Sequence, residues 1–568
     1  MELISKITKD KALLFLFVVV LLLAVFVRFD NFSEVGYWND DQATIPAGLM
    51  WFYPHDYFPG LNYGNPPLGD MIIGAGCMLS GEDFSGVSQV KPFFYPDRFN
   101  LLGEALSKAD SYCHIPMYVF GLFLFILIII FAFTFFDRYS AFFLTTFFAF
   151  YPTTLFYSRW IKPDVIFWTF EIIFLFFLLK FYTTENREIK YLISSAVFLG
   201  LAFATKFTAG ILFLFAGLII LDKYKKEFLS ILKIISKKLN LTFLQNKEYP
   251  SPKELIKNSI IFTLFFIFTT LIPYKLNPLN IIATQKIYQQ YNQNLGGISF
   301  NLINIFNIFK EFVLSLNIIE TLLFPFSLYV LIMLIKKKEK HKLEKFILYL
   351  FAILILTSLL FPVIVQINRA FPLLLSLIFL LALIFSKEEY SIFNVFKIKN
   401  KKLVFSVFLI LYIILSSSIA IQSSPYFVTK NHLICPLTPN NFYCQNSMVG
   451  VGTKAIANYL EPVLGEDETF IGYEGVLFFY LRPQQGLIDH QFNIAFQQQI
   501  GREPTFLEKI QYFRPDNKTI RYLILPPEYQ DEPKYSKDFK KQYSPTEIIK
   551  LKGSEVAYIY DLRELSQS

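Results

Sequence analysis

Charge is scarce in this chain, because Asp, Glu, Lys and Arg make up only 17% of its 568 residues, while 54% are hydrophobic and 18% are aromatic. The mean hydropathy is +0.43. This composition excludes an ordinary water-soluble enzyme of this size and indicates a polytopic membrane protein. The 67 Phe residues strengthen that conclusion, because a soluble protein would need an improbably large core to bury them.

Histidine and cysteine are also rare, at five and four residues. The His residues are scattered and no His or Cys cluster has the spacing of metal ligands, so the sequence predicts no required metal or other cofactor. The cysteines are Cys77, Cys113, Cys435 and Cys444, all on the predicted outer side. On that side, each of the pairs Cys77/Cys113 and Cys435/Cys444 can form a disulfide or consist of buried free thiols.

Apolar runs of about 20 residues predict eleven transmembrane helices. They lie near residues 12–29, 116–136, 141–157, 165–182, 192–205, 207–221, 259–276, 317–335, 346–364, 370–386 and 403–421. The net charge of +8 comes from short Lys runs between these segments. The positive-inside rule explains such runs, so we expect membrane lipid and no nucleic acid as a partner.

The Lys runs also predict the orientation. Lys6, Lys9 and Lys11 precede the first span and place the N-terminus in the cytoplasm of a multi-pass plasma-membrane protein. Alternation then places the Lys-bearing loops 184–190, 222–258, 336–345 and 387–402 inside, and the segments 30–115, 158–164, 277–316, 366–369 and everything after Gln422 outside. We expect the first span to be an uncleaved helix rather than a signal peptide, because no small-x-small cleavage site precedes Arg28.

The spans divide the chain into two parts. Residues 1–421 form a transmembrane domain with a long first outer loop at 30–115 and a basic inner loop at 222–258, predicted to be a helix at the anionic inner leaflet. Residues 422–568 form a small soluble α/β domain outside the membrane, because apolar runs shorten and polar residues return. Within it we expect strands at 469–471, 476–481, 519–525 and 556–560 and helices at 454–464 and 504–513.

Two adjacent carboxylates, Asp40 and Asp41, follow the first span. Their side chains point to opposite sides of an extended chain or diverge by about 100° on a helix, so they do not form a closely coupled dyad. One can serve as a general base while the other binds substrate or orients a backbone. The alternative is a solvated pair that caps a helix starting near Ala43, since Asp is a favoured N-cap residue.

A stiff backbone segment and a charged cluster lie farther along the chain, also on the predicted outer face. Asn65, Pro66 and Pro67 predict a rigid turn, because each Pro fixes φ and restricts its predecessor. Arg159 and Asp164 belong to a charged cluster between two spans. A cation at this depth suits a lipid-linked phosphate, or it snorkels to the interface.

Two further cations lie at predicted outer boundaries. Lys206 stands where the charge rule disfavours Lys, although a Lys in a helical hairpin can also reach the interface. Arg369 lies between two apolar spans. If these two and Arg159 converge, they form an anion-binding ring.

The order of these motifs resembles the protein O-mannosyltransferase and aminoarabinose transferase superfamily, glycosyltransferases of the C type that include family 39 and its relatives. The motifs are Trp-x-Asp-Asp at 38–41, Pro-Pro-Leu at 66–68, Arg-x4-Asp at 159–164 and Thr-Lys-Phe-Thr at 205–208. The resemblance covers about 210 residues from the N-terminus and weakens afterwards to Arg369 and the general layout.

The resemblance implies a GT-C-like membrane fold and an enzyme that transfers a sugar, with inversion, from a polyprenyl- or dolichyl-phosphate donor at the outer face. The acceptor is a protein, a glycan or a lipid. Asp40 then inherits the role of catalytic base and Asp41 that of a supporting acid. The residues implied for donor phosphate binding are Arg159, Lys206 and Arg369, and those implied for substrate positioning are Asp164, Asn65, Pro66 and Pro67.

Three positions depart from the family pattern. Asp41 stands where Glu is usual and is one methylene shorter. Asn65 stands where His or Lys is frequent, and Asp70 where Lys is common.

Two other functions compete with this interpretation. An oligosaccharyltransferase also combines many spans with an outer C-terminal domain, but its Trp-Trp-Asp-Tyr-Gly segment does not occur in residues 423–568. A transporter or lipid flippase also places charges at the membrane edge. Discontinuous helices and paired half-repeats would favour transport, and the sequence shows neither.

Overall fold

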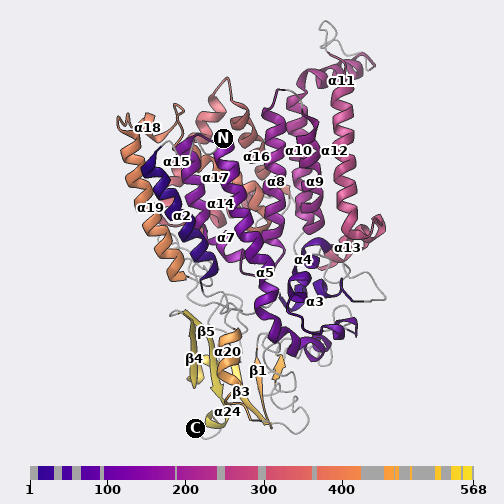
Figure 1. The fold of residues 1–568 in the computed structure, drawn as a ribbon, viewed down its shortest axis with the longest axis vertical. Helices are drawn as coiled ribbons and strands as arrows, with labels where there is room; N and C mark the ends of the chain where they lie inside the picture. The colour runs from indigo at the N-terminus through magenta and orange to yellow at the C-terminus, as the bar shows by residue number, and fades with distance from the viewer. Residues whose placement is uncertain are drawn as a thin grey trace.

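The structure of the protein is a computed structural model. It describes residues 10–30, 41–53, 66–89, 95–185, 188–238, 250–291, 302–360, 367–423, 453–465, 467–472, 486–488, 519–525, 539–551 and 554–565. Figure 1 shows a tall helical body with a small sheet at one end. The predicted combination of a helical membrane protein with a small α/β unit is therefore present.

The first half of the chain supplies most of the helical body. Its helices are α2 (Lys11–Phe29), α3 (Asp41–Leu49), α4 (Pro67–Met78), η3 (Ser85–Gln89), α5 (Tyr95–Phe135), α6 (Arg138–Phe150), α7 (Pro152–Tyr157), α8 (Asp164–Thr183), α9 (Ile189–Thr205), η4 (Phe207–Ala209), α10 (Gly210–Lys223), α11 (Lys225–Lys238) and α12 (Lys253–Leu271).

The second half completes the body and adds the sheet. Its elements are η5 (Ile272–Tyr274), α13 (Pro278–Tyr291), α14 (Ile303–Leu314), α15 (Ile318–Lys336), α16 (Lys342–Leu360), α17 (Ile367–Leu383), α18 (Ile392–Val395), α19 (Lys401–Ser423), α20 (Thr453–Leu460), β1 (Glu468–Gly472), β2 (Gly486–Ile488), β3 (Thr519–Leu525), β4 (Glu547–Leu551), β5 (Ser554–Asp561) and α24 (Leu562–Leu565).

Local sequence explains where several of these helices begin. The Asp10 carboxylate accepts hydrogen bonds from the Ala12 and Leu13 amides at the start of α2, and Asp137 does the same at the start of α6. Asn317 and Glu320 form a reciprocal capping box at the start of α15. Such side chains satisfy amides that have no partner in the first turn of a helix.

Each of the eleven predicted spans overlaps at least one helix of the described structure. Among the described residues, six helices are long and apolar enough to cross a membrane, or seven if a pair bent by 90° at residues 223–225 is one span. The helical path of the chain is interrupted at two further places. Pro152 begins α7 directly after the extended Tyr151, and the extended Lys206 separates α9 from η4.

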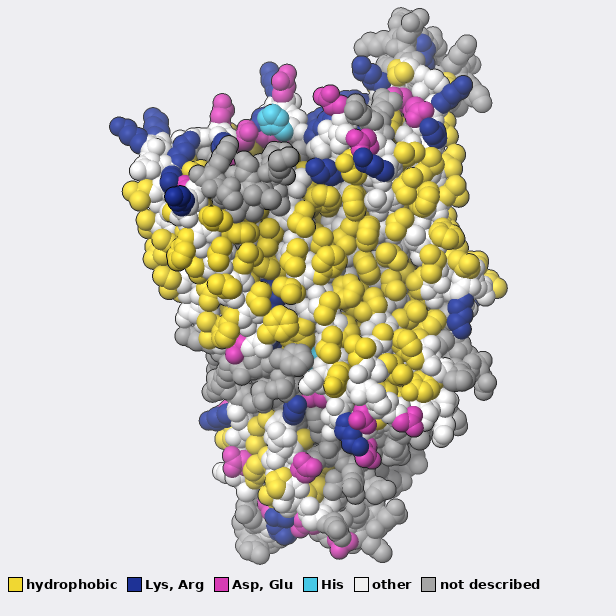
Figure 2. All heavy atoms as spheres, in the orientation of Figure 1, with side chains coloured by type: hydrophobic (Ala, Val, Ile, Leu, Met, Phe, Trp, Pro, Cys, Tyr) yellow, Lys and Arg dark blue, Asp and Glu magenta, His cyan; other side chains and the backbone are white. Residues whose placement is uncertain are grey.

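The surface of the helical body is apolar along its middle. Figure 2 shows a broad band of hydrophobic side chains there, with charged side chains gathered at the two ends. Large apolar residues on the outward faces of α2, α12, α15 and α19 are exposed, among them Phe15, Leu22, Leu264, Phe268, Leu322, Ile335, Leu411 and Ile414. A soluble protein rarely exposes so much contiguous apolar surface, whereas lipid covers it in a membrane.

Ion pairs connect the predicted inner segments at the end of the body that carries the label N in Figure 1. Lys402 pairs with Asp10 at 2.7 Å, Lys337 pairs with Glu344 at 2.8 Å and with Glu388 at 3.2 Å. These contacts join segments that are far apart in the sequence. In Figure 1 the sheet, α3, α4 and α13 lie toward the opposite end.

The interior of the body is packed with aromatic rings. Trp168 of α8 stacks on Phe371 of α17 with ring centroids 4.1 Å apart, and Phe131 of α5 stacks on Phe379 of α17 at 5.3 Å. Close ring pairs add about 1 kcal/mol each beyond the area they bury. They hold α5, α8 and α17 together.

The first outer loop carries a close helix pair. A Cβ atom added to Gly48 of α3 would lie 2.2 Å from the Asp70 carbonyl oxygen of α4, and one added to Gly74 would lie 2.3 Å from the Gly48 carbonyl. Only glycine allows two backbones to approach so closely. A disulfide between Cys77 and Cys113 ties α4 to α5, and Cys435 and Cys444 lie outside the described residues.

The sheet has the strand order β2-β1-β3-β5-β4. β1 pairs in parallel with β2 and β3, and β5 pairs antiparallel with β3 and β4. β1, β3 and β5 cover predicted strands, whereas the predicted strand at 476–481 and helix at 504–513 lie outside the described residues. Lys454, in α20, pairs with Asp110 of α5 at 2.9 Å and so links this region to the helical body.

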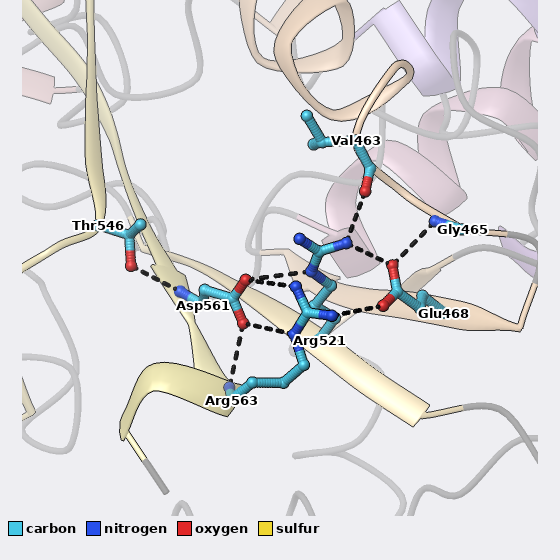
Figure 3. A network of polar contacts seen from close by, with 7 residues as sticks. All are labelled: Val463, Gly465, Glu468, Arg521, Thr546, Asp561 and Arg563. Atoms are coloured by element: carbon cyan, nitrogen blue, oxygen red, sulfur yellow. Dashed lines mark hydrogen bonds and ion pairs between the residues drawn. The ribbon is translucent and has the colours of Figure 1, made fainter. Parts of the chain in front are cut away.

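Four charged side chains bind the strands at one edge of their core, as Figure 3 shows. Arg521 of β3 donates to Glu468 at 2.7 Å and to Asp561 at 3.1 Å, and Arg563 donates to the same two carboxylates at 3.2 and 3.0 Å. Burial acts to raise the pKa of Glu468, but the hydrogen bonds from Arg521 and the Gly465 amide, together with the positive charges of Arg521 and Arg563, hold that pKa below 4.5. Burial likewise opposes the hydrogen bonds from Arg563 that lower the pKa of Asp561 below 3.8.

These lowered pKa values predict acid sensitivity of the sheet. The stabilisation is fully present above about pH 4.5, the ordinary value of Glu, and is lost as the pH falls through the lowered pKa values, because protonation removes the ion pairs. We expect Arg521→Gln to cost about 1–3 kcal/mol at pH 7 and to flatten the loss of stability below pH 4.5. Hydrogen exchange of the β3 and β5 amides in the full chain measures both effects.

The control is Lys541→Gln, a change at an exposed Lys outside this network. Its exchange profile should match that of the wild type. Equal protection of β3 in Arg521→Gln and in the wild type at pH 7 would contradict the stabilising role of the network.

Candidate functional site

The candidate site lies where α4, the segment before α8 and the end of α9 meet. Asp40 and Asn65 lie outside the described residues, and for Asp41 and Arg369 the structure describes the backbone alone. Asp41 is the first residue of α3, and Arg369 lies in the first turn of α17. The positions of the other predicted residues are described below.

The Pro-Pro step starts a helix. Pro66 is the N-cap of α4 with ψ 141°, and Pro67 is its first residue. Pro suits this position, because its fixed φ matches a helix and the missing N–H would have no partner there. The stiff segment that the sequence predicts therefore fixes the direction in which α4 starts.

Gly69 brings α4 against both neighbouring segments. A Cβ atom at this position would lie 2.3 Å from the Pro163 Cβ and 3.1 Å from the Thr205 Cγ2. The residues that follow these two contacts are Asp164 and Lys206. The Pro-Pro segment, the Arg-x4-Asp segment and Lys206 thus meet at one place in the fold.

Asp164 and Lys206 form an ion pair. Asp164 begins α8, where the positive end of the helix dipole favours a carboxylate, and it is 1% exposed. Lys206 is the C-cap of α9 in an extended conformation, which turns its side chain away from the helix axis. The pair satisfies a buried anion that would otherwise be costly.

Glu171 adds a second buried carboxylate to α8. It lies two turns beyond Asp164 on the same helix face, and both of its oxygens are buried without a hydrogen-bond partner among the described residues. Lys206 and Asp164 act on it electrostatically. Two buried carboxyl groups, those of Asp164 and Glu171, therefore lie near Lys206.

Arg159 is buried at the end of α2. Its Nη2 donates to the Val27 carbonyl at 2.6 Å, and its guanidinium lies 5.9 Å from the centre of the Tyr118 ring. Arg28 lies close by and donates to the carbonyls of Ala24, Ala149 and Phe148 at 3.0–3.1 Å. Each guanidinium thus binds carbonyls at a helix C-terminus, where a cation is favoured.

The structure does not test the predicted anion-binding ring. Lys206 lies beside Asp164 and Arg159 lies beside the end of α2, whereas the Arg369 side chain is not described. Convergence of the three cations on one phosphate stays a prediction. In the described ranges no group of three or more His, Cys, Asp or Glu side chains has the arrangement of a metal site, and the expectation that no metal is required also stays a prediction.

Sequence reasoning missed Arg28 and Glu171. A signal existed for Glu171, since it is the one carboxylate within the apolar run 165–182 and an ionisable residue inside a span indicates function. Arg28 resembles any cation that snorkels from the end of a first span. Its contact with the end of α6 depends on the tertiary structure.

A family match covers the two later motifs. Residues 103–239 match the family described as dolichyl-phosphate-mannose-protein mannosyltransferase, and this range contains Arg159, Asp164, Glu171 and Lys206. The match confirms the predicted resemblance to this superfamily of membrane glycosyltransferases. No sequence among the curated proteins matches the chain.

Several solved structures are similar to the chain. ArnT from Cupriavidus metallidurans in the apo state has a TM-score of 0.48 and 11% identity over 96% of this chain and 97% of that one. The Saccharomyces cerevisiae Pmt1–Pmt2 complex bound to the sugar donor has a TM-score of 0.30 and 16% identity over 49% and 36%. The Archaeoglobus fulgidus oligosaccharyltransferase has a TM-score of 0.40 and 13% identity over 90% and 67%.

The glycine contact of α4 predicts a sharp effect of a single methyl group. Gly69→Ala should lower the free energy of unfolding by about 1–3 kcal/mol, because the new Cβ meets the rigid Pro163 ring. Gly217→Ala is the matched control, since a Cβ at that helical position meets nothing within 4 Å and should leave stability unchanged or slightly higher. Thermal unfolding of both variants in the same detergent compares them, and equal midpoints would contradict the contact.

The Asp164–Lys206 pair predicts strong coupling between two substitutions. Lys206→Met leaves a buried carboxylate without its cation and should cost about 3–5 kcal/mol, whereas adding Asp164→Asn should recover part of that loss. A double-mutant cycle by denaturant or thermal unfolding gives the coupling free energy, expected above about 1 kcal/mol. Strictly additive effects would show that the two side chains do not interact.

Proposed function

We propose that this chain is an integral membrane glycosyltransferase. Its residues 103–239 match the family described as dolichyl-phosphate-mannose-protein mannosyltransferase. It transfers a sugar, with inversion, from a polyprenyl- or dolichyl-phosphate donor to a protein, glycan or lipid acceptor at the outer membrane face. The observation that carries the proposal is the contact of Gly69 with Pro163 and Thr205. It supports the proposal because it brings the helix that follows Pro66 and Pro67 against the residues that directly precede Asp164 and Lys206.

The chemical step begins with the acceptor hydroxyl. Asp40 takes the hydroxyl proton while the acceptor oxygen forms a bond to the anomeric carbon. The bond between that carbon and the phosphate oxygen breaks on the opposite side, which inverts the configuration. Asp41, at the start of α3, assists as a supporting acid, and the proton ends on the Asp40 carboxylate.

The leaving polyprenyl phosphate gains negative charge as its bond to the sugar breaks. Cations near the breaking bond stabilise that charge in the transition state. Arg159, Lys206 and Arg369 supply them in this proposal, with Asp164 orienting Lys206 through their ion pair. Asn65, Pro66 and Pro67 position the substrate through the start of α4.

The topology supports an outer site. The Lys-bearing loops of the chain share one end of the helical body with Asp10, as the ion pairs of Lys402 and Lys337 indicate. The positive-inside rule assigns that end to the cytoplasm. The motifs of the first loop then face outward, as does the domain after Gln422.

The central test replaces the proposed base. Asp40→Asn should reduce sugar transfer at least about a hundredfold while leaving thermal unfolding unchanged, because the amide cannot accept the proton. Asp83→Asn is the control, since Asp83 is an exposed carboxylate of the same loop that bonds to Ser85. Transfer from a labelled polyprenyl-phosphate sugar measures the effect.

Two outcomes would contradict the proposal in different ways. Unchanged transfer in Asp40→Asn would remove this residue from the mechanism. Movement of the labelled lipid between leaflets without any transfer by the wild-type protein would favour a flippase instead.

A further inference from the structure

Asp70 is a buried carboxylate that the proposed mechanism leaves without a role. It lies in the first turn of α4 and is 1% exposed, and its Oδ1 has no hydrogen-bond partner among the described residues. A buried polar atom without a partner destabilises the fold, and more so when it is charged. Native structures keep such a group where a ligand or a function uses it.

The fold prevents Asp70 from leaving this position. Its carbonyl oxygen lies against Gly48 of α3, and the preceding residue, Gly69, lies against Pro163 and Thr205. The disulfide between Cys77 and Cys113 fixes the other end of α4. These three anchors hold the backbone of the short helix α4 in place at Asp70.

Tyr274 lies within electrostatic reach of the Asp70 carboxylate and is fully buried. The next two residues, Lys275 and Leu276, have φ angles of 56° and 55°, a left-handed conformation that is costly for a side chain such as Leu. The Lys275 ammonium lies 5.8 Å from the centre of the Trp51 ring. The backbone is thus strained where η5 meets α3 and α4.

We infer that Asp70 accepts hydrogen bonds from the sugar hydroxyls of the lipid-linked donor, next to the proposed phosphate site; this inference rests on the proposed function. Burial raises the pKa of the Asp70 carboxyl well above 3.8, so it ionises only where hydrogen-bond donors reach it. Sugar hydroxyls are such donors, whereas a phosphate anion is not. Asp70 follows Gly69, whose two contacts directly precede Asp164 and Lys206 in the sequence, so it lies beside the segments that carry these two residues.

A structural role of Asp70 and a role in ligand binding predict different effects of its substitution on stability. If Asp70 served the fold, removing its charge would destabilise the protein. Because its Oδ1 has no partner in the described structure, Asp70→Asn should instead leave the unfolding temperature unchanged or raise it. Stability therefore separates ligand recognition from a structural function.

The test compares two lipids that differ only in the sugar. Binding of dolichyl-phosphate mannose and of dolichyl phosphate is measured on the full chain in lipid nanodiscs, for the wild type, Asp70→Asn and the control Asp83→Asn. We expect Asp70→Asn to weaken binding of dolichyl-phosphate mannose about tenfold and to leave binding of dolichyl phosphate unchanged. Asp83→Asn should leave both unchanged.

Several results would overturn the inference. They are equal affinity of the wild type for the two lipids, equal weakening of both by Asp70→Asn, a lowered unfolding temperature of that variant, and unchanged donor binding with a raised KM for the acceptor. Failure of the proposed function gives a different result, in which the wild type binds the sugar-bearing lipid selectively but transfers its sugar to no acceptor.

Discussion

The structure depends on the compensation of buried charge by helix ends. A charge inside an apolar body is costly unless a partner satisfies it, and here the ends of helices provide much of that compensation. Asp164 sits at the start of α8 and pairs with Lys206 at the end of α9. Arg28 binds the last carbonyls of α6, and Arg159 binds a carbonyl near the end of α2.

This arrangement explains why charged residues gather where helices break. A continuous helix satisfies its own backbone and offers no group to a buried ion, whereas an interrupted one leaves carbonyls and amides at each new end. Tyr151 and Pro152 end α6 and begin α7, and Lys206 ends α9. The first interruption divides the span predicted at 141–157, whereas the second lies at the predicted boundary between two spans. Both create polar helix ends, near which the proposed site lies.

The sequence predicts the helices well because their signal is local. Each apolar run overlaps a helix, because contact with lipid selects apolar residues in each span separately. The Lys runs lie at one end of the body, because the positive-inside rule acts on each loop separately. Strands β2 and β4 were not predicted, because both are short edge strands without a strong alternating pattern. The Pro-Pro step was predicted as a rigid turn, and it is the start of α4.

The site was predictable only as a set of motifs. Their order indicates the superfamily, but the contacts between them are set by packing across long sequence separations. Nothing in the sequence around Gly69 shows that its missing Cβ makes room for Pro163 and Thr205. The same limit applies to Arg28, whose partners in α6 lie about 120 residues away.

Compensated and uncompensated charges carry different information about function. Asp164, Lys206 and Arg28 have partners, so each contributes to the fold whatever else it does. Asp70 and Glu171 have buried oxygens without a partner among the described residues. Burying these atoms destabilises the fold, and no contact in the described structure offsets that effect. Buried carboxyl groups with perturbed pKa values occur most often at functional sites, so these two residues are the ones that the proposed chemistry would use and the fold would not miss.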